Sequence, residues 1–296
     1  MKLAVITDIH SNHFALEAAL ELIDKEIPDA IIFLGDYISD CPCPEKTMAL
    51  IYQTRDRYPC FFVRGNREDY MLAHRRGAND GWEHNTSSGS LLYTYEHLTE
   101  KDLDFFAKMP IYADIALPGA PIITACHGSP ARTKEWILDR HELLEKYMSQ
   151  MRGEVLLCGH THHAQHVHKT VLKDGGPVKR TAIFCPSVGL PQDGKSHARL
   201  TLLTLYGDRF VPRMLPLSYD REALFREFHE SGLVESTGVW ARCIMQGIID
   251  ERDYALECVT LAWKMALADR YTGHTTLPEK YWETAAKAIG MPSKIQ

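Results

Sequence analysis

The sequence of 296 residues contains no run of about 18 consecutive apolar residues, which is the length that a membrane-spanning helix needs. Its beginning also lacks the basic and apolar regions of a signal peptide. We therefore expect a cytoplasmic protein without a membrane partner. Internal repeats and low-complexity segments are absent as well. A chain of this length can bury a large core, either as one domain or as a domain with an appendage.

An excess of positive charge is also missing, since the formal net charge at pH 7 is −6. This balance argues against a general polyanion-binding surface, so we expect no stable complex with nucleic acid. A local cationic metal centre could still attract phosphate groups.

The eight cysteines show neither a disulfide framework nor the spacing of a zinc site. Cys126, Cys158 and Cys185 lie in or beside apolar runs, where a reduced thiol behaves as a small hydrophobic group. Cys41 and Cys43 flank one proline in a loop. Cysteines one residue apart bridge poorly and match no usual zinc spacing, so we expect free thiols here.

Five short apolar runs predict strands that are buried on both faces of a sheet. They are residues 3–7, 30–34, 61–63, 122–126 and 155–158. Each run is followed by residues that can bind a metal ion. In chain order, these seven donors are Asp8, His10, Asp36, Asn66, His127, His160 and His162. Because ligands of open α/β sheets collect beyond the carboxyl ends of the strands, we expect the donors to converge at one edge.

Helical patterns alternate with these runs and predict right-handed βαβ units. Ser11 or Asn12 is placed to cap the first helix. Residues 68–108 are expected to form a helical insertion beside the site, and a long helix is expected over about 134–151. Turn signals then separate four more apolar runs, which predict an antiparallel meander in the same sheet or in a second sheet packed on it. These runs are residues 165–172, 180–185, 198–205 and 210–215.

Residues 217–296 show helical patterns only and predict a C-terminal extension to a main domain of residues 1–216. Within the extension, Thr276 and Glu279 predict a capping box that opens a last helix ending at Gly290. The extension carries none of the seven donors. We expect it to pack onto the main domain or to form a homo-oligomer interface, and a lid over the site is a third alternative.

The donor set suits two metal ions. Asp8 and His10 lie two residues apart, so a local turn can aim both side chains at one ion. A single carboxylate, Asp36, can place one oxygen on each of two ions and hold them about 3.5–4 Å apart, as in two-metal hydrolases. The set mixes imidazole nitrogens with carboxylate and amide oxygens and contains no thiolate. We therefore expect two divalent or trivalent transition-metal ions, namely manganese, iron or zinc.

In this order, the motifs resemble those of the calcineurin-like metallophosphoesterase superfamily, in a bacterial subgroup of small phosphoesterases. The matching blocks are Asp8-Ile9-His10-Ser11-Asn12, Gly35-Asp36, Gly65-Asn66, His127-Gly128, Gly159-His160-Thr161-His162 and the late loop 186–191. The resemblance spans about residues 1–216 and implies an α/β fold, a four-layer α/β/β/α sandwich around a dinuclear centre. It also implies that the first metal is held by Asp8, His10, Asp36 and His162. The second metal would be held by Asp36, Asn66, His127 and His160.

The sequence departs from the superfamily after the Gly-Asn pair, where many members carry a histidine and this chain has Arg67. That histidine is thought to protonate the leaving oxygen or to steady the transition state. Arginine stays charged and cannot donate the proton, but its guanidinium can hold phosphate oxygens with two hydrogen bonds. The proton would then come from water or from His74 or His84 of the insertion, and both histidines are also compatible with exposed positions.

From these features we expect a phosphoric ester hydrolase, in which a metal-bridging hydroxide attacks phosphorus in line. The residues expected to carry catalysis are Asp36, Asn66, Arg67 and His127. The residues expected to contact the substrate are Arg67, His13 and Tyr37, and Tyr37 is equally compatible with packing. Three further histidines follow His160 and His162 in the chain, namely His163, His166 and His168. We expect them to be solvated or to lie behind the donors.

The expected substrate is a phosphorylated small molecule or nucleotide, either a phosphodiester or a phosphomonoester. A Ser/Thr protein phosphatase and a dinucleoside polyphosphate hydrolase stay open as alternatives, and both need a groove that the sequence does not identify. A non-catalytic scaffold of the same fold is the third alternative. A scaffold is expected to lose metal ligands, whereas all seven donor positions are filled here.

Overall fold

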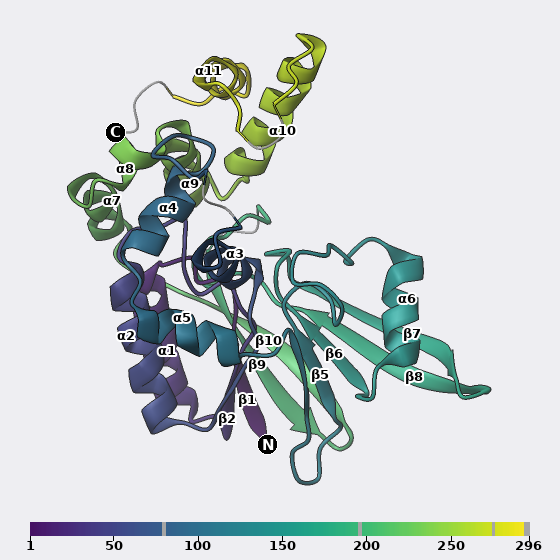
Figure 1. The fold of residues 1–296 in the computed structure, drawn as a ribbon. Helices are drawn as coiled ribbons and strands as arrows, with labels where there is room; N and C mark the ends of the chain where they lie inside the picture. The colour runs from purple at the N-terminus through teal and green to yellow at the C-terminus, as the bar shows by residue number, and fades with distance from the viewer. Residues whose placement is uncertain (79–80, 195–196, 274–275, 293–296) are drawn as a thin grey trace.

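The computed structural model describes residues 1–78, 81–194, 197–273 and 276–292 and contains two five-stranded sheets flanked by helices (Figure 1). The strands of the first sheet, in spatial order, are β10 (Arg209–Pro216), β9 (Arg199–Tyr206), β1 (Lys2–Ile6), β2 (Ala30–Phe33) and β3 (Cys60–Phe62). Strands β1, β2 and β3 are parallel, and β9 pairs antiparallel with β1. The parallel strands are joined through helices α1 (His13–Glu26) and α2 (Pro44–Arg57).

The second sheet has the same mixed character. Its strands, in spatial order, are β4 (Tyr112–Ile115), β5 (Ile123–Cys126), β6 (Val155–Cys158), β8 (Gly176–Phe184) and β7 (Gln165–Lys173). Strands β5, β6 and β8 are parallel, while β4 and β7 pair antiparallel at the two edges. Helix α6 (His141–Gln150) packs on the outer face of this sheet.

Both faces of the central strands are buried, which explains why their sequences are apolar throughout rather than alternating. In β1, Leu3 and Val5 belong to the apolar cluster between the two sheets, together with Leu157 of β6. Ala4 and Ile6 point the other way and pack against the helices outside the first sheet. The layers therefore run helix, sheet, sheet, helix, and the expected four-layer α/β/β/α sandwich is confirmed.

The expected meander is split between the two sheets. The hairpin β7–β8 joins the second sheet, whereas the hairpin β9–β10 returns to the first sheet beside β1. The four apolar runs thus form strands where expected. Their partners differ because β8 pairs in parallel with β6, so the chain crosses between the sheets after β8.

The helix expected over about 134–151 is shorter, since α6 begins only at His141. Before it, Ser129 accepts hydrogen bonds from the backbone N–H groups of Ala131 and Arg132. Trp136 donates its indole N–H to Asp139 at 2.5 Å. Such local side-chain bonds compete with helix formation and favour turns. The first helix behaves as expected, because Asn12 caps it by accepting a bond of 3.1 Å from the Ala15 backbone.

The region expected as a helical insertion contains α3 (Asn66–Arg75), α4 (Gly89–Glu96) and α5 (Glu100–Lys108). The C-terminal helices follow β10. They are α7 (Arg221–Glu230), α8 (Leu233–Thr237), α9 (Val239–Asp250), α10 (Tyr254–Ala268) and α11 (Glu279–Ala288). Figure 1 shows them gathered at the end of the molecule where α3 and α4 also lie. Within the described residues, none of the helices is long and apolar enough to cross a membrane.

The C-terminal helices build their own apolar cluster, but three residues of the main sandwich belong to it as well, namely Cys41, Tyr93 and Leu190. The predicted capping box at the start of α11 is wrong. Pro278 occupies the N-cap position without a side-chain bond, and the Glu279 carboxylate instead accepts a hydrogen bond from Thr86 near α4. A contact between distant segments has therefore taken the glutamate that the local motif needed. The helix ends as predicted, with Gly290 in the left-handed region.

Candidate metal centre

The ends of five strands meet at one edge of the sandwich and bring the donor segments together. The Asp8 backbone N–H donates to the Gly35 carbonyl at 3.1 Å, and the Gly159 N–H donates to the His127 carbonyl at 3.0 Å. Several donors adopt left-handed backbone angles, which cost non-glycine residues of order 1–3 kcal/mol each and cluster at functional sites. These residues, with φ of 53°, 51°, 53°, 65° and 56°, are Asp8, His10, Asp36, His160 and His162.

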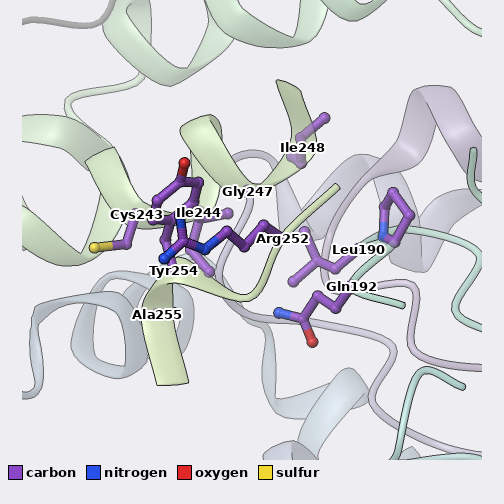
Figure 2. Close-up of a pocket in the computed structure, with 10 residues that line it drawn as sticks. Leu190, Gln192, Cys243, Ile244, Gly247, Ile248, Arg252, Tyr254 and Ala255 are labelled. Atoms are coloured by element: carbon purple, nitrogen blue, oxygen red, sulfur yellow. The ribbon is translucent and has the colours of Figure 1, made fainter. Parts of the chain in front are cut away.

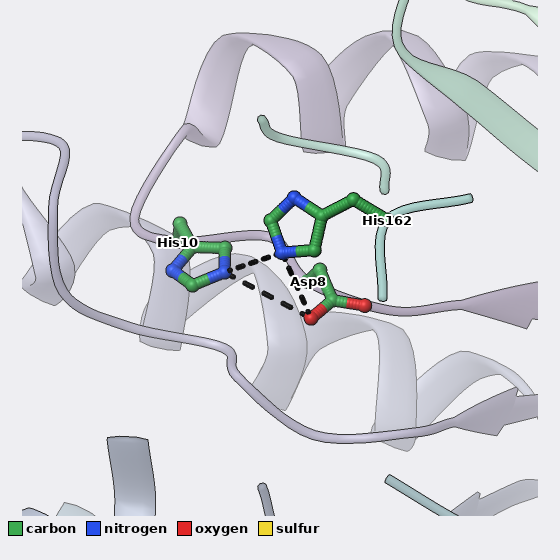
Figure 3. A group of neighbouring side chains, drawn as sticks. All are labelled: Asp8, His10 and His162. Carbon is green, nitrogen blue, oxygen red and sulfur yellow. Dashed lines mark hydrogen bonds and ion pairs between the residues drawn. The ribbon is translucent and has the colours of Figure 1, made fainter. Parts of the chain in front are cut away.

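Asp8, His10 and His162 form a first group of potential ligands (Figure 3). The two imidazoles face each other, with 3.3 Å between their Nε2 atoms. Asp8 Oδ1 lies 3.3 Å from His162 Nε2 and 3.8 Å from His10 Nε2. All three side chains are buried, so their polar atoms converge on one enclosed point rather than on bulk solvent.

Asp36, His127 and His160 form a second group directly beside the first. His127 Nε2 lies 3.3 Å from Asp36 Oδ2. The same Asp36 oxygen lies 3.8 Å from His10 Nε2, and His127 Nε2 lies 3.8 Å from Asp8 Oδ1. The two groups therefore share one polar centre, with Asp36 placed between them.

Backbone carbonyls hold two of the imidazoles in the orientation that a metal ligand needs. His127 Nδ1 lies 2.8 Å from the Leu34 carbonyl, and His162 Nδ1 lies 2.7 Å from the Leu190 carbonyl. An Nδ1–H that donates to a carbonyl leaves the Nε2 lone pair free to face the centre. Both rings are thus arranged to bind a cation through Nε2.

Several buried atoms at the centre have no hydrogen-bond partner among the described residues. Three of them face the centre, namely Asp8 Oδ1, Asn66 Oδ1 and His127 Nε2, and the others are His10 Nδ1, Asp40 Oδ2 and Arg67 Nε, which lie in ion-pair contacts. A buried polar atom without a partner is costly, and native proteins rarely leave one without a reason. Because the first three atoms belong to the predicted donors, the residues fit metal ions well.

The ionisation of the centre supports the same conclusion. Burial alone would raise the pKa of Asp36, but the neighbouring charge of His127 lowers it to about 2. Burial would lower the pKa of His127, but the carboxylates of Asp36 and Asp8 raise it to about 10. The buried carboxylates thus favour positive charge at this point of the centre, and a metal cation would supply it.

Arg67 lies at the edge of this centre, at the start of α3. Its guanidinium Nη2 is 2.8 Å from Asp40 Oδ2, and its Nε is 3.9 Å from Asp36 Oδ2. Although burial lowers its pKa, the charges of Asp40 and Asp36 raise it above the ordinary value, so the guanidinium stays charged. About 19% of the side chain remains exposed, which leaves it accessible from solvent.

Asp40 is a site residue that the sequence interpretation missed. Its side chain is buried and lies 3.0 Å from His10 Nδ1, so one carboxylate contacts both a predicted metal ligand and Arg67. Burial would raise its pKa, but Arg67 and His10 hold it well below the usual range. The only local signal was its place in the loop that begins at Asp36.

Glu68 was also missed, although it organises the loops that carry two donors. Its buried carboxylate accepts hydrogen bonds from the backbone N–H groups of Asp36 at 2.9 Å, Tyr37 at 2.8 Å and Gly65 at 2.7 Å. Burial and the neighbouring Asp36 charge raise its pKa to about 7. A glutamate three residues after the Gly65 N-cap is a capping-box signal that could have identified it.

Tyr37 and His13, two of the predicted substrate contacts, are both buried. Tyr37 is fully buried, and its hydroxyl donates to the Val63 carbonyl, so it is part of the apolar core rather than a pocket wall. His13 is buried with Nε2 2.9 Å from Glu227 of α7. The same Glu227 also pairs with Lys46. His13 therefore belongs to a charge network with the C-terminal helices.

The candidate proton donors of the insertion also have other contacts. The His74 ring stacks on Trp82 with 4.3 Å between ring centroids, and His84 lies 3.4 Å from Glu96. Among the later histidines, His166 and His168 are exposed on β7, as expected.

The turns that replace the first part of the expected long helix bring an aromatic side chain beside the centre. The half-buried Trp136 ring lies 6.2 Å from the His160 ring and 6.1 Å from the His163 ring. This indole was not foreseen, because the sequence pattern placed it on a helix.

A small hollow lies between the loop 190–192 and helices α9 and α10 (Figure 2). Leu190, Ile244 and Tyr254 are among the residues that line it. None of the seven donors lines it, so it is not the metal centre. Its position matters because the Leu190 carbonyl orients His162, and the C-terminal helices pack behind that carbonyl.

Comparisons with known proteins bear on the fold and on the family. Over 245 residues, the chain is 24% identical to an uncharacterized protein of Methanocaldococcus jannaschii, a match that covers 80% of this chain and 95% of that protein. A crystal structure of a metallophosphoesterase from Sphaerobacter thermophilus has the same fold, with a TM-score of 0.64 and 20% identity over 85% of this chain and 100% of that chain. A hypothetical protein from Pyrococcus horikoshii is similar, with a TM-score of 0.65 and 19% identity over 83% and 97% of the two chains.

The family model of the calcineurin-like phosphoesterases matches residues 1–164, which include all seven donors and Arg67. The resemblance seen in the sequence is thereby confirmed, and the chain belongs to the calcineurin-like phosphoesterase family.

Proposed function

We propose that this protein hydrolyses phosphoric esters with two transition-metal ions. The observation that carries the proposal is the pair of adjacent ligand groups, which share one buried polar centre beside the charged Arg67. A non-catalytic scaffold would not need to keep every donor or to hold the imidazoles in ligand orientation.

The metal ligands in this proposal follow from the two groups. One ion would be held by Asp8, His10, Asp36 and His162. The other would be held by Asp36, Asn66, His127 and His160. The short distances from Asp36 Oδ2 to His10 and to His127 support a bridging role for this carboxylate. The mixture of nitrogen and oxygen donors favours manganese, iron or zinc.

When bound, such ions lower the pKa of a water molecule toward about 7 and neutralise charge on the phosphoryl oxygens. The chain itself supplies orientation and further positive charge. In this proposal, the Arg67 guanidinium binds a phosphoryl oxygen, and this interaction strengthens as charge develops in the transition state. Asp40 forms an ion pair with that guanidinium through its Oδ2 atom. His10, which contacts the same oxygen, keeps its Nε2 directed at the centre.

Arg67 cannot give a proton to the leaving oxygen. The reaction should therefore be faster for esters whose leaving group is already a weak base, such as phenolates with low pKa. The substrate in this proposal is a phosphodiester or a phosphomonoester of small size, nucleotides included.

The test combines metal analysis with two chromogenic esters. The purified protein is loaded with Mn²⁺ and assayed with bis(4-nitrophenyl) phosphate and with 4-nitrophenyl phosphate, next to the Asp36→Asn variant. We expect metal-dependent turnover of at least one ester by the wild type, and the preferred ester distinguishes a diesterase from a monoesterase. Less than one metal per two chains together with no turnover of either ester would contradict the proposal.

A further inference from the structure

Trp240 of the C-terminal helices contacts Asp40, the carboxylate beside the predicted metal centre. Trp240 lies in the first turn of α9, and its indole Nε1 donates a hydrogen bond of 2.9 Å to Asp40 Oδ1. Trp240 is separated from Asp40 by 200 residues and lies beyond the segment that matches the family model. This bond is thus a feature of the extension and not of the family motifs.

The two oxygens of Asp40 face different parts of the protein. Oδ1 accepts hydrogen bonds from Trp240 and, at 3.2 Å, from Ser90 Oγ of α4. Oδ2 lies 3.0 Å from His10 Nδ1 and 2.8 Å from Arg67 Nη2. The carboxylate is only 1% exposed, so water does not substitute for any of these groups. Asp40 therefore connects α4 and α9 to one predicted metal ligand and to the predicted phosphate ligand.

A carboxylate with this arrangement is sensitive to how its outer oxygen is held. If Oδ1 lost the hydrogen bond from the indole, the carboxylate could rotate toward other hydrogen-bond partners. Oδ2 would then leave the position that faces both His10 and Arg67. A histidine ligand whose Nδ1 loses its partner binds metal more weakly, because its ring is no longer oriented. The effect of Trp240 would thus reach the centre without any contact to substrate or metal.

We propose that Trp240 is a positioning residue for the metal centre, and that through Asp40 it fixes both His10 and Arg67. The inference rests on the proposed function for the roles of His10 and Arg67. It makes the C-terminal helices part of the active-site support rather than an independent appendage. The packing of α9 behind Leu190, whose carbonyl orients His162, agrees with that role.

The chain offers a matched control for this tryptophan. Trp282 of α11 also uses its indole N–H, which donates to Ser87 Oγ at 3.1 Å. Its ring meets the Trp240 ring edge-on at 6.2 Å, so both lie in the same aromatic contact. Ser87 is bonded to none of the seven donors among the described residues. Trp240→Phe and Trp282→Phe therefore remove the same chemical group from the same helical region, but only one of them touches Asp40.

The experiment measures Mn²⁺ affinity of the apo protein by isothermal titration calorimetry, together with kcat and KM on the better chromogenic ester. We expect Trp240→Phe to weaken the tighter Mn²⁺ site by about tenfold, in the range found when a partner behind a histidine ligand is removed. The value of kcat/KM should fall by a similar factor. Trp282→Phe should leave both quantities within about twofold of the wild type. Equal losses in the two variants would overturn the proposal, because they would indicate general loosening of the helices.

A double-mutant cycle tests whether Trp240 acts through Asp40. We expect Asp40→Asn to weaken Mn²⁺ binding, and we expect Trp240→Phe to add less than about twofold in that background. A full tenfold further loss in the double variant would overturn the proposed route.

Failure of the proposed function can be distinguished from failure of this inference. If the wild type binds Mn²⁺ but hydrolyses neither ester, the proposed activity is wrong, and the affinities of the variants still decide the role of Trp240. If the wild type binds no Mn²⁺ at all, both proposals are wrong.

Discussion

The seven metal donors differ from the residues that contact the donor loops in how clearly the sequence reveals them. The donors occur in short local motifs, each directly after an apolar strand, and the fold brings them together because parallel strands end at one edge. Asp40, Glu68 and Trp240 belong to no such motif. They are connected to the donor loops by contacts across 30 to 200 residues of sequence, such as those of Asp40 with His10 and Trp240. The chemistry of the site is thus local in sequence, while its precision depends on distant partners.

The largest effect is expected at Asp36, which both ligand groups share. Asp36→Asn removes a negative charge and one possible bridging oxygen, so we expect kcat/KM to fall by about three orders of magnitude, in line with the several kcal/mol that metal ions contribute to catalysis. Metal content should fall from two ions to one or fewer per chain, as measured by elemental analysis. A variant that keeps two ions and near-normal activity would show that neither metal binding nor catalysis depends on this carboxylate.

Arg67 should give the next largest effect. We expect Arg67→Ala to lower kcat/KM by about 100-fold, as does removal of a charged group that stabilises a transition state. Metal content should be unchanged, because Arg67 is not a ligand. Arg67→Lys should recover only part of the loss, since an ammonium group cannot form two parallel bonds. Unchanged kinetics in the alanine variant would remove Arg67 from the site.

Glu68 tests whether a residue behind the donors controls stability. Glu68→Ala would leave three buried backbone N–H groups without their acceptor, and each costs about 1–3 kcal/mol when left unpaired. We expect the free energy of unfolding of the apo protein to fall by at least about 3 kcal/mol in urea titrations. Glu68→Gln keeps one acceptor oxygen and should lose less. If the two variants lost equal stability, these three hydrogen bonds would not account for the stabilising effect of Glu68.

Tyr37 should show the smallest effect on activity, although it directly follows Asp36. Tyr37→Phe removes the hydroxyl that bonds the Val63 carbonyl, which should cost about 1 kcal/mol of stability. The kcat/KM value should stay within about twofold of the wild type. A large fall in kcat/KM with normal stability would return Tyr37 to the substrate pocket.

The same contrast explains which features could be predicted from the sequence. Strand positions followed from apolar runs such as that of β1, because strands buried on both faces carry a strong and continuous signal. The partner of β8 could not be inferred, since pairing depends on where the chain crosses between the sheets. The contact of His13 with Glu227 could not be inferred, because sequence distance from His10 says nothing about α7. The capping box at Glu279 failed for the same reason, since Thr86 competes for that side chain.

The role of the C-terminal helices shows this limit most clearly. Their helical patterns predict their positions and leave packing onto the main domain, a homo-oligomer interface and a lid as alternatives. The indole bond from Trp240 to Asp40 could not be foreseen, because neither residue lies in a motif and only the folded chain places them 2.9 Å apart.

The most direct test of the dinuclear centre is electron paramagnetic resonance of the protein loaded with Mn²⁺. If Asp36 joins two ions at about 3.5–4 Å, the spectrum should show two spin-coupled Mn²⁺ ions per chain. In Asp36→Asn, the coupled signal should be replaced by that of isolated ions or be lost. Signals from isolated ions only, in a fully loaded wild-type protein, would contradict the dinuclear centre.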